Sequence, residues 1–242
     1  MDDRARALEH NLAAVTGRIA RAAAAPRAAG IEASQPSLIV VTKFHPGADV
    51  TRLASLGVTD VGENRDQEAA AKAVEVAIPA LRWHFIGQLQ TNKAKSVVRY
   101  AHSVHSVDRA PLVKALGKAM REQRSETGRA ELRCFIQVDL GDYPETAGRG
   151  GAAPSEVLPL ARMITATDGL VLDGVMAVAP LGEDPDQAFA RLAGISAQLR
   201  GEFPQASAIS AGMSQDLEAA IRWGATHLRV GSDVLGPRPV VL

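Results

Sequence analysis

Eight short apolar segments alternate with helical segments along the 242 residues, and this alternation limits the folds open to the chain. The eight are rich in valine, isoleucine and leucine, as buried strands are. They occupy residues 37–43, 59–62, 81–87, 101–107, 132–140, 171–178, 207–210 and 227–230. A helical segment precedes each of the last seven, and such long connections favour parallel strands.

The fold class predicted from this count is α/β, as a single (β/α)8 TIM barrel, a fold that runs to about 250 residues. An open doubly wound sheet is the alternative. The glycine-rich G-x-G-x-x-G turn expected after the first strand of that fold is absent from this chain.

An additional helix is predicted in front of the first strand, over residues 4–25. Its apolar residues recur on one face, as Leu8, Leu12, Val15 and Ile19. No change in composition marks a linker along the chain. Residues 1–242 are therefore predicted to form one domain, with the helix of residues 1–30 packed on the barrel.

The formal charges balance, with 27 basic and 27 acidic residues, so the composition does not favour nucleic acid or an anionic membrane as a partner. No segment approaches the roughly 18 uninterrupted apolar residues of a membrane span. The acidic opening Asp2-Asp3 does not resemble a secretory signal. The single cysteine, Cys134, excludes an internal disulfide and is predicted to be an inert buried thiol. These features predict a cytoplasmic protein.

The first strand segment ends on Lys43, and residues 44–47 then break the strand. The chain has six lysines against 21 arginines, so a lysine at this position suggests amine chemistry. A desolvated lysine can lose its proton and form a Schiff base, whereas arginine cannot be deprotonated in a protein. The alternative is a strand-end lysine whose amine simply reaches solvent.

Two segments with small residues follow the last two strands. Residues 210–214 read Ser-Ala-Gly-Met-Ser, and residues 229–232 read Arg-Val-Gly-Ser. Small residues let backbone N–H groups approach a ligand, and Ser214 is interpreted as the N-cap of the next helix. The loops after strands seven and eight of a barrel often hold a phosphate, so a phosphate site is predicted here. Each loop alone is better explained as an ordinary turn, whereas two such loops on adjacent strands, facing a strand-end lysine, favour the phosphate site.

A Schiff-base lysine beside a phosphate site suggests pyridoxal 5′-phosphate (PLP) as the cofactor. Arg229 is expected to point into the barrel mouth and to face the pyridine nitrogen, although a surface ion pair is the alternative. A cation at that position disfavours protonation of the nitrogen. The bound cofactor would then be a weaker electron sink than one paired with a carboxylate.

Seven short motifs lie along nearly the whole chain: Val-Thr-Lys at 41–43, Gly-Glu-Asn at 62–64, Trp-His-Phe-Ile-Gly at 83–87, Leu-Gln-Thr-Asn-Lys at 89–93, Gly-Val-Met-Ala at 174–177, Gly-Met-Ser at 212–214 and Arg-Val-Gly-Ser at 229–232. In identity and order they strongly resemble the YggS/PROSC family of pyridoxal phosphate homeostasis proteins. The resemblance implies a barrel like the N-terminal domain of alanine racemase, a fold type III PLP protein, with PLP held as a Schiff base on Lys43.

The resemblance also implies that Asn64 lies beside the cofactor and that small residues of the last two loops surround its phosphate. The full predicted cofactor-binding set is Lys43, Asn64, His84, Ser210, Gly212, Met213, Ser214, Arg229, Gly231 and Ser232. No catalytic residue and no metal ligand is predicted. The sequence departs from the usual family pattern at Phe44, at Ala211 and at residues 149–151, and the last departure leaves the role of the 141–153 loop open.

The related racemases use a tyrosine from a second domain as an acid–base group, and this chain, ending at Leu242, is expected to lack that domain. Its tyrosines are Tyr100, before the fourth strand, and Tyr143, in the 141–153 loop. The predicted function is therefore intracellular PLP homeostasis by a monomer without established turnover, with apo PLP-dependent enzymes as candidate recipients. The alternatives are a PLP-dependent racemase or lyase that uses His84 as second base, and a Schiff-base or phosphosugar barrel without PLP.

His84, His102 and His105 fall on predicted core strands. His84 stands between two aromatic residues, where a buried structural histidine is the favoured interpretation. His102 and His105 are three apart on one strand, so they are expected on opposite faces and not as a metal pair. No cysteine, histidine and carboxylate spacing typical of zinc is present.

Overall fold

The computed structural model describes residues 2–31, 35–141 and 150–237. Within them, eight parallel strands close into a barrel in chain order, with β8 hydrogen-bonded to β1. The strands are β1 (Ser37–Val41), β2 (Asp60–Glu63), β3 (Arg82–Phe85), β4 (Ala101–Val107), β5 (Leu132–Gln137), β6 (Leu170–Met176), β7 (Ala208–Ser210) and β8 (His227–Val230). The predicted (β/α)8 barrel is confirmed, and the open doubly wound sheet is excluded.

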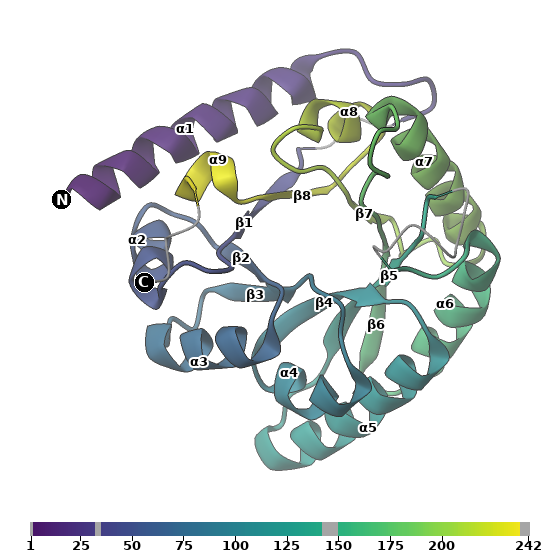
Figure 1. Ribbon diagram of the computed structural model, residues 1–242. Coiled ribbons are helices and arrows are strands. Elements are labelled where there is room, and N and C mark those ends of the chain that lie inside the picture. Colours follow the sequence, from purple (N-terminus) through teal and green to yellow (C-terminus); the bar gives the residue numbers. More distant parts are fainter. Residues whose placement is uncertain (1, 32–34, 142–149, 238–242) are drawn as a thin grey trace.

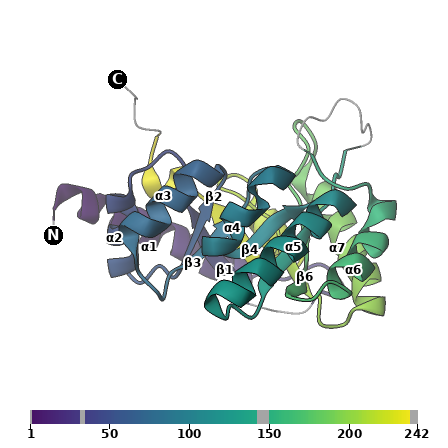
Figure 2. The same ribbon diagram turned by 90° about the horizontal axis from the view of Figure 1, so that it is seen from below.

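Helices surround this barrel (Figure 1). They are α1 (Asp3–Ala24), α2 (Gly47–Ser55), α3 (Asp66–Val76), α4 (Ala94–Tyr100), α5 (Ala110–Thr127), α6 (Val157–Thr165), α7 (Pro185–Glu202), α8 (Leu217–Arg222) and α9 (Ser232–Leu235). Short 3-10 turns, η1 (Thr91–Lys93) and η2 (Pro154–Glu156), precede α4 and α6. Consecutive helices from α3 to α6 lie side by side along the outside of the barrel (Figure 2). Helix α9 was not predicted, because four residues are too few to show a helical period.

Helix α1 packs across α8 and α9 and also touches α2 (Figure 1). Of its predicted apolar face, Leu8, Val15 and Ile19 are buried, and Leu12 is partly buried. Full burial of such a side chain contributes about 1.5–3 kcal/mol. The amphipathic face therefore holds α1 against the elements that follow β7 and β8, at the end of the barrel where the candidate site lies.

The strand β1 ends at Val41, two residues earlier than predicted. The backbone N–H of Thr42 still donates to Gly62 O on β2, over 2.9 Å. The N–H of His45 then donates to Thr42 O, over 3.1 Å, which closes a turn. Lys43 therefore lies in this turn, immediately outside the sheet.

A register shift between β3 and β4 corrects the prediction for the histidines. Trp83 pairs with Ala101 and His84 pairs with Ser103, so His102 is an extra residue on β4. A bulge of this kind breaks the simple alternation of side chains along a strand. The rings of His102 and His105 both lie against His84, with ring centroids 5.7 and 5.2 Å away. The prediction that they project to opposite faces is wrong.

Candidate functional site

A cavity of about 610 Å³ opens at the carboxyl ends of β1, β7 and β8, and is called here the mouth cavity. Six of the ten predicted cofactor-binding residues line it, namely Lys43, Met213, Ser214, Arg229, Gly231 and Ser232. Residues of the 179–185 loop form another wall, and Val41 and Ile86 contribute apolar surface. The cavity therefore combines an amine, a guanidinium and two hydroxyls with apolar walls, as small-molecule sites do.

The turn that carries Lys43 has an unusual backbone. Phe44, the next residue, has φ of 69°, in the left-handed region that bulky side chains rarely adopt. Such a conformation costs about 1–3 kcal/mol and persists only where the surroundings hold it. The Arg65 guanidinium lies 5.1 Å from the centroid of the Phe44 ring, within the range of a cation–π contact.

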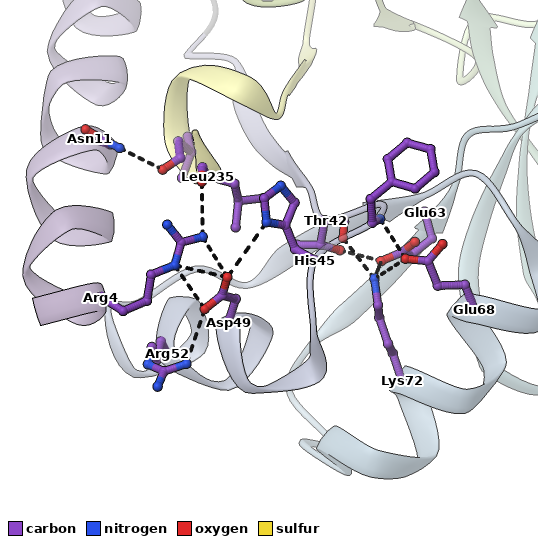
Figure 3. Close-up of polar contacts among 12 residues, drawn as sticks. Arg4, Asn11, Thr42, His45, Asp49, Arg52, Glu63, Glu68, Lys72 and Leu235 are labelled. Carbon is purple, nitrogen blue, oxygen red and sulfur yellow. Dashed lines mark hydrogen bonds and ion pairs between the residues drawn. The ribbon is translucent and has the colours of Figure 1, made fainter. Parts of the chain in front are cut away.

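Two side chains of α3 hold the backbone on both sides of Lys43 (Figure 3). Glu68 Oε1 accepts a hydrogen bond from the Phe44 N–H, over 2.7 Å. Lys72 Nζ donates to Thr42 O over 2.9 Å and to Glu68 Oε1 over 2.7 Å. The turn is therefore tied to α3 as well as to the sheet.

Glu63, the last residue of β2, completes this network (Figure 3). It is 1% exposed, and its Oε1 accepts from Thr42 Oγ1 over 2.7 Å and from Lys72 Nζ over 2.8 Å. Its Oε2 is buried without a hydrogen-bond partner among the described residues. Burial raises the pKa of Glu63, and the bond from Lys72 opposes that rise. Thr42, Glu63, Glu68 and Lys72 are called here the lysine-turn network.

Sequence reasoning missed the lysine-turn network. Its only local signal is the spacing of Glu68 and Lys72, four residues apart on a helix, which is equally common on exposed helix faces. Nothing in that spacing tells which face of α3 turns towards β1. Lys72 is in fact buried, at 6% exposure.

His45 borders the mouth cavity on the other side of Lys43. Its Nδ1 lies 3.8 Å from Asp49 Oδ2 on α2, and Arg4 Nη2 of α1 contacts the same oxygen over 2.6 Å (Figure 3). Burial lowers the pKa of His45, and the nearby charge of Arg4 lowers it further. The imidazole is therefore predominantly neutral at pH 7.

Ser214 and Ser232 come from different loops, and their hydroxyl oxygens lie 3.3 Å apart at the mouth cavity. The prediction that Ser214 caps the next helix is wrong, because Asp216 occupies the N-cap position of α8. The Asp216 carboxylate instead accepts from the Met213 N–H and folds the loop back on itself. The Ser214 side chain is thereby left at the cavity.

The two predicted glycines have different roles. Gly212 has φ of 90°, and a Cβ there would lie 2.7 Å from the Ala220 Cβ, so this glycine allows the loop to pack on α8. Gly212 is not among the residues that line the cavity. At Gly231, which does line it, a Cβ would lie 3.1 Å from Val41 O. The β8 loop therefore packs closely on the end of β1.

Arg229 is the buried cation of the mouth cavity, at 5% exposure. Its Nη1 donates to Ser210 Oγ over 2.7 Å, and its Nη2 donates to Ala177 O over 2.9 Å. Burial lowers the pKa of Arg229 to about 10, so the guanidinium stays charged at pH 7. The surface ion pair considered as an alternative is excluded. Ser210 does not line the cavity and serves instead as an acceptor that orients Arg229.

A chain of buried hydrogen bonds continues from Ser210 through the barrel interior. Ser210 Oγ is bonded to His105 Nδ1 over 2.8 Å, and His105 Nε2 lies 3.1 Å from His84 Nδ1. His84 Nε2 is bonded to Asp60 Oδ1 over 2.7 Å, and Asp60 pairs with Arg82. The chain thus joins the cavity arginine to the opposite end of the barrel.

Burial disfavours the charged form of three histidines in or beside this hydrogen-bonded chain. Burial lowers the pKa of His105 well below its usual value, and it lowers the pKa values of His102 and His227 to about 4. The bond from His84 and those from Arg82 hold the pKa of Asp60 below its usual range despite burial. At pH 7 the three histidines with lowered pKa values are neutral.

Asn64 and His84, like Ser210 and Gly212, are not among the residues that line the mouth cavity. His84 is buried at 3% exposure and hydrogen-bonded inside the barrel, as the structural interpretation of this residue predicted. Asn64 follows β2, and its Oδ1 is buried without a hydrogen-bond partner among the described residues. Buried amide oxygens are normally paired, so this acceptor is available to a donor that the described residues do not supply.

Other predictions concern the cysteine, metal binding and membrane spans. Cys134 is buried, and burial raises the pKa of its thiol, as expected for an inert residue. Over the described ranges, no cluster of three or more histidine, cysteine or acidic residues is arranged to hold a metal ion. None of the helices described is long and apolar enough to cross a membrane. Residues 142–149 of the predicted loop, with Tyr143, lie outside the described residues.

The fold is that of a barrel of the alanine racemase type, because the chain matches the family Alanine racemase, N-terminal domain, over residues 5–239. It is 41% identical to the pyridoxal phosphate homeostasis protein of Mycobacterium tuberculosis, over 98% of this chain and 95% of that protein. It is 45% identical to the protein of the same name from Corynebacterium glutamicum, over 84% of this chain and 90% of that protein. The chain therefore belongs to the family of pyridoxal phosphate homeostasis proteins.

A solved structure agrees with this relationship. PipY of Synechococcus elongatus, solved with PLP bound, is 30% identical and superposes with a TM-score of 0.78. The match covers 95% of this chain and 100% of that chain. The curated relatives are named as homeostasis proteins rather than as enzymes. The predicted family resemblance is confirmed.

Proposed function

We propose that this protein binds PLP reversibly through a Schiff base on Lys43 and acts as a carrier or buffer of the cofactor in the cell. One observation carries the proposal: Lys43 lines the same cavity as Arg229 and the paired hydroxyls of Ser214 and Ser232. The relative PipY was solved with PLP bound, and its structure superposes on nearly the whole chain.

The residues of the cavity fit the parts of PLP. Ser214, Gly231 and Ser232 offer hydroxyls and closely packed backbone for the phosphate, and the first N–H groups of α9 have no intrahelical acceptor. Arg229, held by Ser210 and Ala177, would face the pyridine nitrogen and disfavour its protonation. Asn64 does not line the cavity, so its buried amide oxygen would accept from the ligand only where the ligand reaches beyond that lining. His84 lies in the barrel interior and does not contact the cavity.

The aldehyde of bound PLP supplies a carbon that reacts reversibly with a neutral amine. The chain contributes the geometry: the lysine-turn network holds Thr42 and Phe44, so the side chain of Lys43 leaves the backbone in a fixed direction. The neutral ring of His45 adds no positive charge beside that amine. The apolar side chains of Val41 and Ile86 exclude water from the cavity wall.

A carrier role is supported over catalysis by what surrounds the cavity. None of its described lining residues is a tyrosine, and the Tyr100 hydroxyl is bonded to Asp66 outside the cavity. His84, the alternative second base, is engaged with Asp60 and Ser103 in the barrel interior. An unprotonated ring nitrogen also makes the cofactor a weaker electron sink than one paired with a carboxylate. We further propose that the chain works as a monomer with one binding domain and hands PLP to apo enzymes.

Titration with PLP tests the proposal. The wild-type protein should develop the absorbance of a lysine–PLP adduct with one equivalent, and borohydride should abolish it. Lys43→Ala should show no such band. Incubation of the holoprotein with amino acids in deuterated water should give no exchange of the α-proton. Exchange of any amino acid's α-proton at catalytic rates would favour the racemase or lyase, and a wild-type protein without the band would favour a barrel that does not use PLP.

A transfer assay tests delivery. Holoprotein is mixed with an apo PLP-dependent enzyme in the presence and absence of a PLP trap, beside a matched amount of free PLP. Direct delivery predicts that the trap abolishes activation by free PLP but leaves activation by the holoprotein. Equal loss in both reactions would contradict direct delivery.

A further inference from the structure

Side chains of helix α1 reach two segments around the mouth cavity, the β7 loop and α9, from outside the barrel. Arg18 donates to the backbone of the β7 loop, at Ser214 O, over 2.9 Å. Asn11 donates to Val234 O of α9 over 3.1 Å (Figure 3). Arg4, at the start of the helix, donates to Leu235 O over 3.0 Å, the last residue of α9. One rigid element therefore binds the segments that carry both serines of the cavity.

Arg18 makes the most extensive of these contacts. Its Nη1 pairs with Asp233 Oδ2 over 2.7 Å, in the residue after Ser232. Its Nε and Nη2 pair with the carboxylate of Glu218 on α8, over 3.0 and 3.1 Å. A guanidinium is planar and rigid, so contacts made from one guanidinium fix the relative positions of its partners. The β7 loop, α8 and α9 are thereby joined at a single side chain.

The position of Arg18 separates it from the ligand. It is not one of the residues that line the mouth cavity, whereas Ser214 and Ser232 are. The two carboxylates of Asp233 and Glu218 neutralise its charge. Any effect of Arg18 on an anion in the cavity therefore passes through the geometry of the two loops.

We infer that Arg18 is a positioning residue that sets the separation of the Ser214 and Ser232 hydroxyls and so controls affinity for the phosphate of the ligand. The inference rests on the proposed function, because it assigns the phosphate to these loops. Helix α1 is then part of the binding apparatus and not only a cover for the barrel. The imine-forming end of the cavity, at Lys43, does not depend on Arg18.

Two ligands distinguish binding at the phosphate loops from binding at the imine-forming end of the cavity. PLP and pyridoxal share the aldehyde and the ring, but only PLP carries the phosphate. Arg18→Gln should raise the dissociation constant for PLP about fivefold, as loss of partly exposed ion pairs predicts. The constant for pyridoxal should stay at the wild-type value. Arg18→Lys keeps the charge but cannot make the same contacts, so it should resemble Arg18→Gln. Arg21→Gln removes an exposed arginine one turn along α1 and should bind both ligands normally.

Amide hydrogen exchange of the ligand-free proteins gives an independent reading. In Arg18→Gln, exchange should become faster in residues 211–216 and 231–236 and stay unchanged in β1 and β2. Three outcomes would each overturn the inference. They are unchanged exchange in those loops, wild-type PLP affinity of either Arg18 variant, and an equal loss of PLP and pyridoxal binding. Failure of the proposed function is recognised separately, because the wild-type protein would then form no borohydride-reducible adduct.

Discussion

The carboxylate oxygen Oε1 of Glu68 lies 2.7 Å from the backbone nitrogen of Phe44, the residue that follows Lys43. This contact holds Phe44 at φ of 69°, a conformation that a phenylalanine does not adopt without support. Strain at such a position is maintained by the surrounding structure and is a feature of functional sites. Helix α3 therefore determines the direction in which the side chain of Lys43 leaves the backbone. Glu68 of this helix does not itself line the mouth cavity.

The first prediction concerns Glu68. Glu68→Ala removes the acceptor of the Phe44 N–H and one partner of Lys72, so the free energy of unfolding should fall by about 1–3 kcal/mol. Adduct formation at Lys43 should also become slower, because the turn is no longer fixed. Glu68→Gln keeps an amide oxygen as acceptor and should recover part of both losses. Urea denaturation and stopped-flow absorbance measure the two quantities. Equal behaviour of the two variants would contradict a role for the hydrogen bond.

The second prediction concerns Lys72. Lys72→Met leaves the buried Glu63 and its neighbour Glu68 without their cation, and such a broken pair costs about 3–5 kcal/mol of stability. The double variant Lys72→Met/Glu63→Gln should be more stable than Lys72→Met, because one uncompensated charge is removed. A double variant less stable than the single one would show that Glu63 does not depend on Lys72.

The loss of stability in Lys72→Met should depend on pH because of the raised pKa of Glu63. The folded-state pKa of Glu63 is raised by burial, so the folded protein binds this proton more tightly than the unfolded chain does. Stability from this group is present at low pH and is lost as pH rises through the folded-state pKa. Without Lys72 the rise in pKa grows. The destabilisation by Lys72→Met should therefore be smaller at about pH 5 than at about pH 8, and the opposite order would contradict the assignment.

The third prediction concerns His227, next to the hydrogen-bonded chain in the barrel interior. Burial lowers its folded-state pKa from 6.5 to about 4, so in that range the unfolded chain binds a proton that the folded protein does not. Stability should fall as pH decreases from 6.5 to about 4. His227→Gln should reduce this slope, whereas His10→Gln, at an exposed position of α1, should leave it unchanged. Urea denaturation at several pH values gives the slope, and an unaltered slope in His227→Gln would be contrary to expectation.

The fourth prediction concerns Ser210, which joins Arg229 to His105. Ser210→Ala removes the partner of Arg229 Nη1 and of His105 Nδ1, both of them buried. The free energy of unfolding should fall by about 1–3 kcal/mol. The absorbance band of bound PLP should also shift, because Arg229, which we propose faces the ring, is no longer held in place. Ser55→Ala, at the exposed end of α2, should change stability by less than about 0.5 kcal/mol. An unshifted band in Ser210→Ala would show that Ser210 does not affect the bound cofactor through Arg229.

Local patterns in the chain were sufficient to predict the barrel. The eight apolar segments and their intervening helices follow from periodicity alone, and the strands at 101–107 and 227–230 have the predicted bounds. The position of Lys43 and Arg229 at the carboxyl ends of β1 and β8 follows from parallel strands, which bring those ends together. These features depend on sequence neighbours and on topology, both of which a single sequence carries.

The missed features depend on side chains that meet across elements. The bulge at His102 is one extra residue in a ladder, and no local pattern in β4 marks it. The N-cap of α8 is Asp216, two residues after Ser214, and the Asp216 carboxylate accepts from the Met213 N–H. The contact of Lys72 with Thr42 requires a particular rotation of α3 against β1. Each is decided by packing between elements and not by propensity.

Peptide mapping after borohydride reduction tests the central claim most directly. The holoprotein is reduced, digested and examined by mass spectrometry, with Lys43→Ala and Lys72→Met treated alongside. The account predicts one pyridoxyl-modified residue, Lys43, in the wild-type protein and in Lys72→Met, and no modified lysine in Lys43→Ala. Modification of a different lysine in the wild-type protein, or unmodified Lys43 after reduction of a PLP-loaded sample, would contradict it.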